Sequence, residues 1–293
     1  MADELVQGEY AASDAIHRTS ELIGLVEAVT WLGEMNFGAG GHQLLDVVLR
    51  AGQSRRDDDE LRTPAPGFMA LGMLGQPELT VGQLKEQAAR MAAASRALEL
   101  TELYAASTFP HERMALAARI TPENATPTEE LKRLAHLLSE LGRVALTEGV
   151  RLCFHNHAGS TVETRDEIDR LFAHADRSVL FQGADLGHLA WAGEDIVRFT
   201  KDYADSIKTL HIKDINPEVR AEGIAQKWDY MTFNRKGIFA ELGEGMVDFP
   251  ALFGVLKSVG FEGWIVVETD VTTKATPLAS ATISRRYLRS IGV

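Results

Sequence analysis

Apolar strand candidates and amphipathic helix candidates alternate along this chain, and that alternation limits its fold more than any other feature of the sequence. From residue 68 onward, strand-like runs are separated by helical patterns such as residues 81–98, where apolar side chains recur every three or four positions. Such alternation is typical of a parallel sheet whose strands are joined by crossover helices. A chain of 293 residues with this pattern fits one α/β barrel of repeated β/α units better than two doubly wound domains.

Seven short β-rich or apolar runs are strand candidates. They cover residues 25–31, 68–74, 100–106, 150–157, 179–185, 207–214 and 264–268. No glycine-rich turn of the type G-x-G-x-x-G follows the first of them, which argues against a dinucleotide-binding domain. Residues 1–24 are expected to form a helical extension, and residues 25–293 the barrel domain. Residues 42–50 are predicted to be helical, residues 53–66 a charged loop and residues 216–241 a long connection.

The net charge argues against a surface that binds polyanions. The chain carries a formal charge of −12 at pH 7, and its basic residues form nothing larger than short pairs such as Arg285 and Arg286. We therefore expect no nucleic-acid partner and no contact with an anionic membrane. No run of about 18 apolar residues is present, so a cytoplasmic protein is expected. The one cysteine, Cys153, allows no intrachain disulfide and is interpreted as a buried strand residue.

Ionisable side chains gather at the ends of four later strand candidates. The carboxyl ends of parallel strands meet at one face of a barrel, and ligands bind there. The side chains in question are His155, His157, Asp185, His211, Lys213, Glu268 and Asp270. A single histidine at a strand end is usually a hydrogen-bonded structural residue. Packing does not explain why four strands would each end in an ionisable side chain.

A metal ion would explain this concentration of charge. Unpaired buried charges cost several kcal/mol each, and a divalent cation would offset that cost for the carboxylates. A mixed set of imidazole and carboxylate ligands suits Mn²⁺, Co²⁺, Zn²⁺ or Fe²⁺ better than Ca²⁺. The sequence therefore predicts a transition-metal site at these strand ends.

Other side chains near the strand ends are candidates for contact with a substrate. His157 is expected on the same face as His155, because side chains two apart on a strand point the same way. His188 is expected to reach a substrate hydroxyl, and Lys213 to stabilise an oxyanion. In the connection over 216–241, two aromatic residues form either a lid or an ordinary anchor of the loop; they are Trp228 and Tyr230. Glu244 belongs either to a tight turn or to the cavity.

The motifs at these positions resemble those of a known family. They are Phe-His-Asn-His-Ala-Gly at 154–159, Asp-Leu-Gly-His at 185–188, Leu-His-Ile-Lys-Asp at 210–214, Leu-Gly-Glu-Gly at 242–245 and Gly-Trp-Ile-Val-Val-Glu at 263–268. In order and spacing the set is similar to that of the xylose isomerase-like TIM barrels, the sugar phosphate isomerase/epimerase superfamily. Within it, the set most resembles the inosose dehydratase branch. The resemblance covers residues 149–291, about half of the chain.

The resemblance implies a divalent metal ion held by His155, Asp185, His211 and Glu268, with Mn²⁺ or Co²⁺ favoured and Zn²⁺ as the alternative. In isomerases and epimerases of the superfamily the first ligand is a glutamate, so His155 argues against a proton shuttle between two glutamates. The resemblance also implies a TIM-type (β/α) barrel with an irregular N-terminal portion, because a strand of the type Asp-Gly-x-Glu is missing. Either the barrel has seven recognisable strands, or an irregular segment fills the gap.

The expected activity is removal of a proton beside the carbonyl group of a polyhydroxylated keto-sugar or keto-inositol, through a metal-bound enediolate. His157, His188 and Glu163 are the candidate bases, and Lys213 would assist the oxyanion or the leaving group. Reprotonation would make the protein an isomerase or epimerase, which is the leading prediction. Loss of a β-hydroxyl would make it a dehydratase of the inosose dehydratase type.

Two further classes stay open at this stage. An endonuclease for abasic DNA shares the fold, but the net charge disfavours it. A non-catalytic or partner-dependent barrel would be compatible with the altered N-terminal half. A homo-oligomer is expected, with residues 1–24 as one possible contact region.

Overall fold

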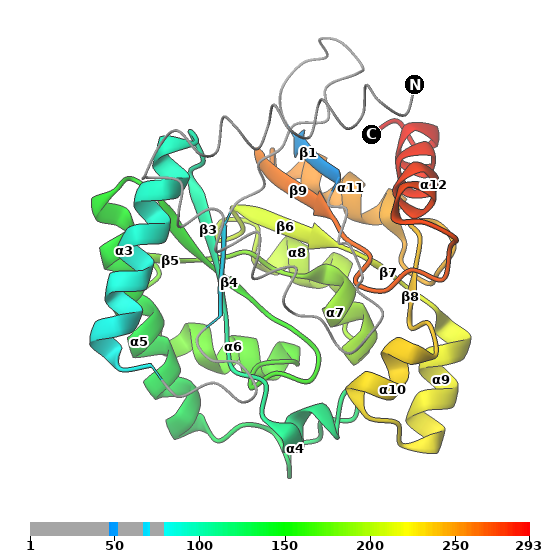
Figure 1. The fold of residues 1–293 in the computed structure, drawn as a ribbon, viewed down its shortest axis with the longest axis horizontal. Helices are drawn as coiled ribbons and strands as arrows, with labels where there is room; N and C mark the ends of the chain where they lie inside the picture. The colour runs from blue at the N-terminus through cyan, green and yellow to red at the C-terminus, as the bar shows by residue number, and fades with distance from the viewer. Residues whose placement is uncertain (1–46, 52–66, 71–78) are drawn as a thin grey trace, which may run out of the picture.

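The fold is known from a computed structural model that describes residues 47–51, 67–70 and 79–293 (Figure 1). The predicted helical extension over residues 1–24, the predicted strand over 25–31 and the predicted loop over 53–66 lie outside the described residues.

Parallel strands form the inside of the molecule (Figure 1). Parallel bridges from Gln182 to Ile207 and from Asp185 to His211 join a four-stranded sheet to a second sheet, so that the strands make one curved wall. In order around the wall they are β2 (Gly67–Ala70), β3 (Glu102–Ala106), β4 (Arg151–His155), β5 (Leu180–Gln182), β6 (Thr209–Ile212) and β9 (Gly263–Val267). This arrangement confirms the predicted (β/α) barrel.

Helices cover the outside of this wall, as the strand–helix alternation predicts (Figure 1). α5 packs against α3 and α6, and α8 packs against α11. Threonine capping boxes begin two of the helices, at Thr80 and Thr164. The outer helices are α3 (Val81–Ala97), α5 (Thr128–Thr147), α6 (Arg165–His174), α8 (Ile196–Asp202), α11 (Phe249–Ser258) and α12 (Pro277–Ser290).

The prediction of a helix over residues 42–50 is wrong for its second half. β1 (Val47–Ala51) is a strand that pairs antiparallel with β9, with Val47 opposite Val267. Val47 and Val48 are β-branched and favour a strand. The partner that completes the ladder lies more than two hundred residues away in the sequence, so local periodicity could not identify it.

The connection over residues 216–241 is more regular than predicted. It contains α9 (Pro217–Gln226), α10 (Tyr230–Arg235) and β8 (Phe239–Ala240), and β8 pairs with β7 (Asp214–Ile215). Asn216 and Asp229 cap the two helices, accepting hydrogen bonds from the first-turn backbone. Two more short helices escaped prediction, α4 (His111–Met114) and α7 (Leu186–Ala192). Helices this short carry too little periodicity to be recognised.

Tyr104, Cys153 and Thr209 pack together inside the barrel below the strand ends. The Tyr104 hydroxyl is hydrogen-bonded to the Thr209 hydroxyl. A Cβ at Gly183 would lie 2.7 Å from the Tyr104 ring and 2.8 Å from the Cys153 Cβ, so only glycine fits at that point. Burial raises the pKa of the Cys153 thiol, which stays protonated as part of this packed floor.

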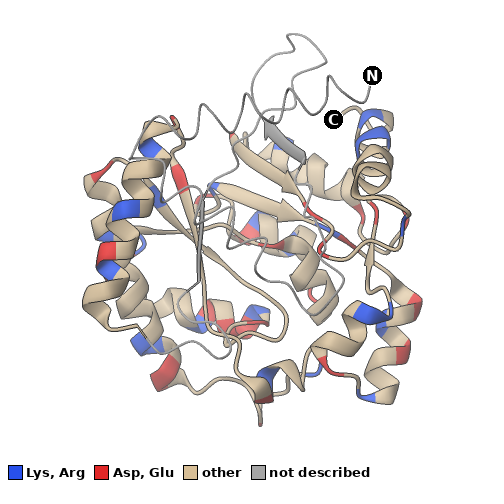
Figure 2. Ribbon diagram, in the orientation of Figure 1, with Lys and Arg blue, Asp and Glu red and all other residues tan. Residues whose placement is uncertain are grey.

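The outer helices carry mixed charge. Acidic and basic residues alternate along α9, whereas α3 carries Lys85, Arg90 and Arg96 with one acidic residue, Glu86 (Figure 2). In the part of the chain that the structure describes, no helix is long and apolar enough to cross a membrane.

Candidate active site

Strand register brings four strand ends together at one place. His155 ends β4, Asp185 is bridged to His211 of β6, and the Glu268 amide donates to the Ile212 carbonyl (3.1 Å) as β9 ends. Each of these side chains therefore leaves the wall at the same level, which is the carboxyl edge of the barrel.

Asn156 fixes the backbone of Asp185 at this edge. Its amide nitrogen donates to the Asp185 carbonyl (3.0 Å), and its amide oxygen accepts from the Asp185 backbone N–H (3.1 Å). The Asn156 side chain thus continues the β4–β5 ladder beyond the last residues of the strands. Asp185 is also the N-cap of α7, since its Oδ1 accepts from the His188 amide (2.9 Å). These contacts leave Asp185 Oδ2 turned toward the histidines.

His155, Asp185 and His211 form the first group of potential ligands. Their nearest ligand atoms all lie within 4.8 Å of one another, and all three residues are buried. Asp185 Oδ2 lies 3.6 Å from His155 Nε2 and 3.9 Å from His211 Nδ1. A metal ion about 2.1 Å from each donor requires donors no more than about 4.2 Å apart, so the two distances from Asp185 Oδ2 suit a single ion.

His155 is held in a form that suits a ligand. Its Nδ1 lies 3.2 Å from the Gly183 carbonyl, a contact in which Nδ1–H donates and Nε2 keeps its lone pair toward Asp185. Burial, with the charges of His211 and Lys213, holds the pKa of His155 well below its ordinary value. The imidazole is therefore neutral at pH 7, as metal binding requires.

Glu268, the fourth predicted ligand, lies beside this group. Its Oε2 is 2.6 Å from His211 Nδ1 and also contacts the Lys213 ammonium. Lys213 lies 3.0 Å from Asp185 Oδ2. Burial opposes the charge on both Asp185 and Lys213. Their mutual attraction outweighs it, lowering the pKa of Asp185 and raising that of Lys213.

A second group lies next to the first and consists of His157, His188 and Asp270. Their nearest ligand atoms also lie within 4.8 Å of one another. His188 Nε2 is 3.5 Å from Asp270 Oδ2, and the rings of His157 and His188 lie 3.5 Å apart. His188 is fully buried, yet neither of its ring nitrogens has a hydrogen-bond partner among the described residues. Asp185 Oδ2 is likewise buried without a hydrogen bond there. Such unsatisfied atoms suit a site that binds an additional group.

His157 belongs to this second group, although the sequence predicts it on the same strand face as His155, because β4 ends at His155. The two histidine rings are 6.3 Å apart. His157 Nδ1 lies 2.8 Å from the Ala158 carbonyl, so Nδ1 carries the proton and Nε2 is the free base. Burial, with the charge of His188, holds the pKa of His157 well below its ordinary value. Phe109 and Tyr230 border the ring, at centroid distances of 4.8 Å and 5.5 Å.

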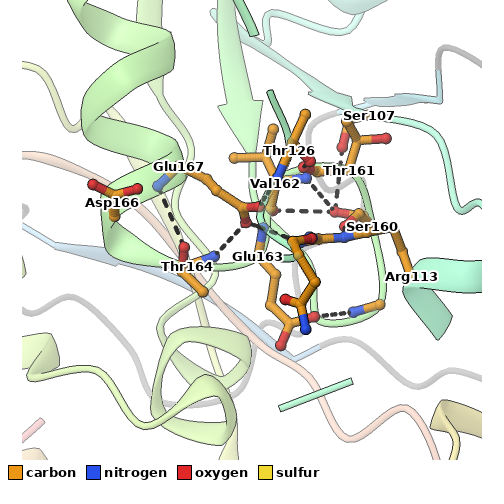
Figure 3. Close-up of polar contacts among 12 residues, drawn as sticks. Ser107, Arg113, Thr126, Ser160, Thr161, Val162, Glu163, Thr164, Asp166 and Glu167 are labelled. Carbon is orange, nitrogen blue, oxygen red and sulfur yellow. Dashed lines mark hydrogen bonds and ion pairs between the residues drawn. The ribbon is translucent and has the colours of Figure 1, made fainter. Parts of the chain in front are cut away.

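Glu163, the remaining candidate base, lies in a different buried network (Figure 3). Its carboxylate accepts from the Gly159 amide (2.7 Å) and the Ala118 amide (2.7 Å). Among the described residues, no hydrogen bond or ion pair joins Glu163 to either ligand group. Burial raises the pKa of Glu163 to about 7. Its contacts favour a role in fixing the loop over residues 157–164, although its role as a base stays a prediction.

Glu167 organises the rest of that network (Figure 3). Its Oε2 accepts from Arg113 Nη2 (2.9 Å) and from the Glu163 amide (2.9 Å), and its Oε1 accepts from the Thr126 amide (2.8 Å). Arg113 Nε also donates to the Ser160 carbonyl (2.9 Å). The buried pair therefore ties α4 and α6 to the loop that carries His157.

Sequence reasoning gave no role to Asn156 or Asp270. Asp270 stands two residues beyond Glu268, just as His157 stands two residues beyond His155, so the spacing in the sequence could have identified it.

Of the two aromatic residues in the connection over 216–241, Tyr230 borders His157 and stacks on Trp191 (5.2 Å), whereas Trp228 packs on Phe233. Glu244 is exposed and paired with Lys274 (2.6 Å), which favours the turn over the cavity. The turn itself is held by Asp214, which accepts from the backbone of residues 243, 245 and 247.

Comparison with known proteins places this arrangement among relatives. The family model of the xylose isomerase-like TIM barrel matches residues 59–291. An inosose dehydratase from Clostridium beijerinckii is 36% identical over 162 residues, which is 55% of this chain and 54% of that protein. One from Geobacillus thermodenitrificans is 33% identical over 162 residues, with the same shares of the two chains. The chain thus spans about half the length of the curated relatives it matches.

Solved structures share the fold at lower sequence identity. The IOLI protein, solved with a bound zinc atom, is 18% identical with a TM-score of 0.55, over 76% of this chain and 74% of that one. A probable 3-DHS dehydratase, AsbF from Bacillus anthracis, is 13% identical with a TM-score of 0.53, also over 76% and 74%. At these identities the likeness concerns the barrel alone.

Proposed function

The chain belongs to the xylose isomerase-like TIM barrel family, and from this premise we propose that it is a divalent-metal-dependent enzyme. It would remove a proton beside the carbonyl group of a polyhydroxylated ketone, a keto-sugar or keto-inositol. The observation that carries the proposal is the pairing of two groups at one barrel edge. One group has the donors for a metal ion, and the other has a neutral histidine with a free ring nitrogen.

The first group fits a divalent transition metal. His155, Asp185 and His211 would hold it, with Glu268 as the fourth ligand beside His211. The mixed imidazole and carboxylate set suits Mn²⁺, Co²⁺ or Zn²⁺. When bound, such an ion polarises a carbonyl oxygen and so makes the neighbouring C–H bond more acidic. Asp185 Oδ2 makes no hydrogen bond to the described residues, although the Lys213 ammonium lies 3.0 Å away, and such an ion would give this oxygen a partner.

The second group supplies the proton transfers. His157 Nε2 has the free lone pair of a base, and burial keeps that imidazole neutral. Neither ring nitrogen of His188 makes a hydrogen bond to the described residues, so both can contact substrate hydroxyls, with Nε2 lying 3.5 Å from Asp270 Oδ2. Lys213 stands between the groups as a buried ammonium that is able to stabilise developing negative charge on oxygen.

Dehydration is the outcome that we favour. The C–H bond next to the carbonyl would break with its proton on His157, its electron pair would form the new C=C bond, and the β-carbon–oxygen bond would break as the hydroxyl takes that proton and leaves as water. Epimerisation by two bases needs an acid–base group on each face of the carbon, and the resemblance of the sequence motifs implies that epimerases carry a glutamate at the position of His155. The inosose dehydratases that match at up to 36% identity support an inosose as the first substrate to test. Isomerisation is the second candidate, because it begins with the same proton removal.

Metal analysis tests the site independently of any substrate. The wild-type chain should hold about one divalent ion, and Asp185→Asn and Glu268→Gln should lose it. A matched control is His111→Gln, which changes a histidine exposed to water on α4. Full metal occupancy in both site variants would show that the ligand assignment is wrong, and a wild-type chain that binds no metal would support the non-catalytic alternative.

Turnover in D₂O tests the reaction. Dehydration of an inosose should give a product lighter by one water, with His157→Gln inactive but still loaded with metal. Deuterium that enters the ketone without loss of water would instead identify an isomerase or epimerase. No exchange and no product with inososes or keto-sugars, from protein that holds its metal, would refute the proposed proton removal.

A further inference from the structure

The buried ammonium of Lys213 contacts three carboxylates at once. Its Nζ lies 3.0 Å from Asp185 Oδ2, lies 2.7 Å from Asp270 Oδ1 and is hydrogen-bonded to Glu268 Oε2. Two of these carboxylates belong to the proposed ligand set, and Asp270 does not. Lys213 therefore contacts both the proposed metal ligands and Asp270, a carboxylate without an assigned role.

Because Lys213 contacts two proposed ligands, Asp185 and Glu268, it competes with a metal ion for their oxygens. Asp185 Oδ2 and Glu268 Oε2 are the atoms nearest the histidine nitrogens, so the cation and the ammonium need the same oxygens. Two positive charges a few ångströms apart in a buried site repel each other strongly. The position of the ammonium therefore influences how tightly the site binds a metal.

The contact with Asp270 differs in kind from the contact with Asp185. Lys213 donates hydrogen bonds to Asp270 Oδ1 and to Glu268 Oε2, whereas Asp185 Oδ2 makes no hydrogen bond although the ammonium is 3.0 Å away. Asp270 is thus a directed partner outside the proposed ligand set, and it can keep the ammonium when the ligand oxygens turn to a cation. Three carboxylates with one ammonium also leave two formal negative charges, which one divalent ion would neutralise.

The ammonium has few other places to go. The Lys213 side chain is only 1% exposed. A Cβ at Gly187 would lie 2.3 Å from the Lys213 Cβ, so the first turn of α7 packs directly against the stem of the lysine. The centre of the Phe239 ring lies 6.0 Å from the ammonium. Without a partner at Asp270, the charge would remain on the ligand carboxylates.

We propose that Asp270 is a positioning residue, which draws the Lys213 ammonium away from Asp185 and Glu268 and thereby sets the metal affinity of the site. The proposal rests on the metal binding proposed above, but not on any particular reaction. It explains why a carboxylate that is not a ligand stands two residues beyond one that is.

A double-mutant cycle on metal affinity tests the proposal without any substrate. Co²⁺ binding would be measured by calorimetry and by its visible absorption for the wild type, Lys213→Met, Asp270→Asn and the double variant. Lys213→Met should bind Co²⁺ about 10-fold tighter or more, and Asp270→Asn about 10-fold weaker. In the Lys213→Met background, Asp270→Asn should weaken binding by only about 2-fold, because the ammonium that it positions is gone. Asp270→Glu, which retains a carboxylate, should restore most of the wild-type affinity.

The outcomes separate this inference from the proposed function. A wild-type chain that binds no Co²⁺ refutes the metal site and the inference together. Metal binding that Asp270→Asn weakens equally in both backgrounds shows that Asp270 acts directly on the ion. Two ions per wild-type chain would make Asp270, His157 and His188 a second cation site, which also overturns the proposal. Asp270→Asn changes the shape of the side chain little, at a position that is partly exposed, so this variant is expected to fold. Its Co²⁺ affinity, compared with that of the wild type and of Asp270→Glu, tests the proposal even if Lys213→Met does not fold.

Discussion

Replacing Glu163 with glutamine should change how the stability of this protein depends on pH. Burial raises the pKa of the Glu163 carboxyl from 4.5 to about 7, against the opposing effect of its bonds to the Gly159 and Ala118 amides and of the Arg113 charge. The folded chain therefore keeps a proton that the unfolded chain releases near pH 4.5. The stability from this group is fully present below pH 4.5 and is lost as the pH rises through about 7.

The size of the effect follows from the two pKa values. The difference between 4.5 and about 7, at about 1.4 kcal/mol for each tenfold change in acidity, corresponds to roughly 3 kcal/mol of unfolding free energy. Glu163 is fully buried, so solvent screening does not reduce this value much. Glutamine cannot titrate, and its NH₂ group cannot accept a hydrogen bond. One of the two backbone amides that donate to Glu163, those of Gly159 and Ala118, would therefore face another donor. The variant should therefore be less stable than the wild type at pH 5 by about 1–3 kcal/mol, and this gap should shrink or reverse by pH 8.

Urea unfolding followed by circular dichroism at pH 5, 6, 7 and 8 would measure this difference. The free energy of unfolding of the wild type minus that of Glu163→Gln should fall with pH, chiefly between pH 5 and 7. Glu222→Gln, which changes an exposed carboxyl on α9, should give a curve parallel to the wild type. Parallel curves for the wild type and Glu163→Gln would refute the raised pKa, and a difference that grows with pH would show that hydrogen bonding outweighs burial.

Three further predictions follow from packing, ion pairing and linkage. Gly187→Ala places a Cβ 2.3 Å from the Lys213 Cβ and should cost about 1–3 kcal/mol of stability in thermal or urea unfolding, whereas Gly254→Ala, where nothing lies within 4 Å, should cost little. Arg113→Met leaves the fully buried Glu167 carboxylate without its cation and should cost about 3–5 kcal/mol; a loss below about 1 kcal/mol would show that the pair contributes little. Chelation of metal should lower the melting temperature, and metal restored at about 100 times its Kd should return about 2.7 kcal/mol; an unchanged melting curve would contradict metal binding by the folded chain.

Much of the fold could be predicted from local patterns, because the barrel repeats the same unit. Helices such as α3 and α5 are long enough for their apolar spacing to be clear, and β4 and β9 are short apolar runs. Prediction failed where the deciding partner is distant in sequence. Residues 47–50 form a strand because they pair with β9, and β8 exists because it pairs with β7.

The histidines and carboxylates at the strand ends were visible in the sequence, but their grouping was not. The period of two along a strand puts His155 and His157 on one face, yet β4 ends at His155, and the chain beyond it carries His157 to His188 and Asp270. In the same way, Glu163 lies close to His157 in sequence, but backbone amides of residues 118 and 159 hold it in the network around Glu167. Sequence separation measures neither distance in space nor the direction of a side chain.

The sequence by itself determined which chemical groups reach the carboxyl edge of this barrel, because strand–helix alternation fixes where each parallel strand ends. Only the tertiary structure decided which of those side chains contact one another and so form each of the two groups. The β4–β5–β6–β9 register sets Asp185 against His155 and His211, and α7 packs against the stem of Lys213, whose ammonium contacts Glu268 and Asp270. The physical reason is that charge interactions depend on distances of a few ångströms in a buried environment, and packing between segments remote in sequence sets those distances.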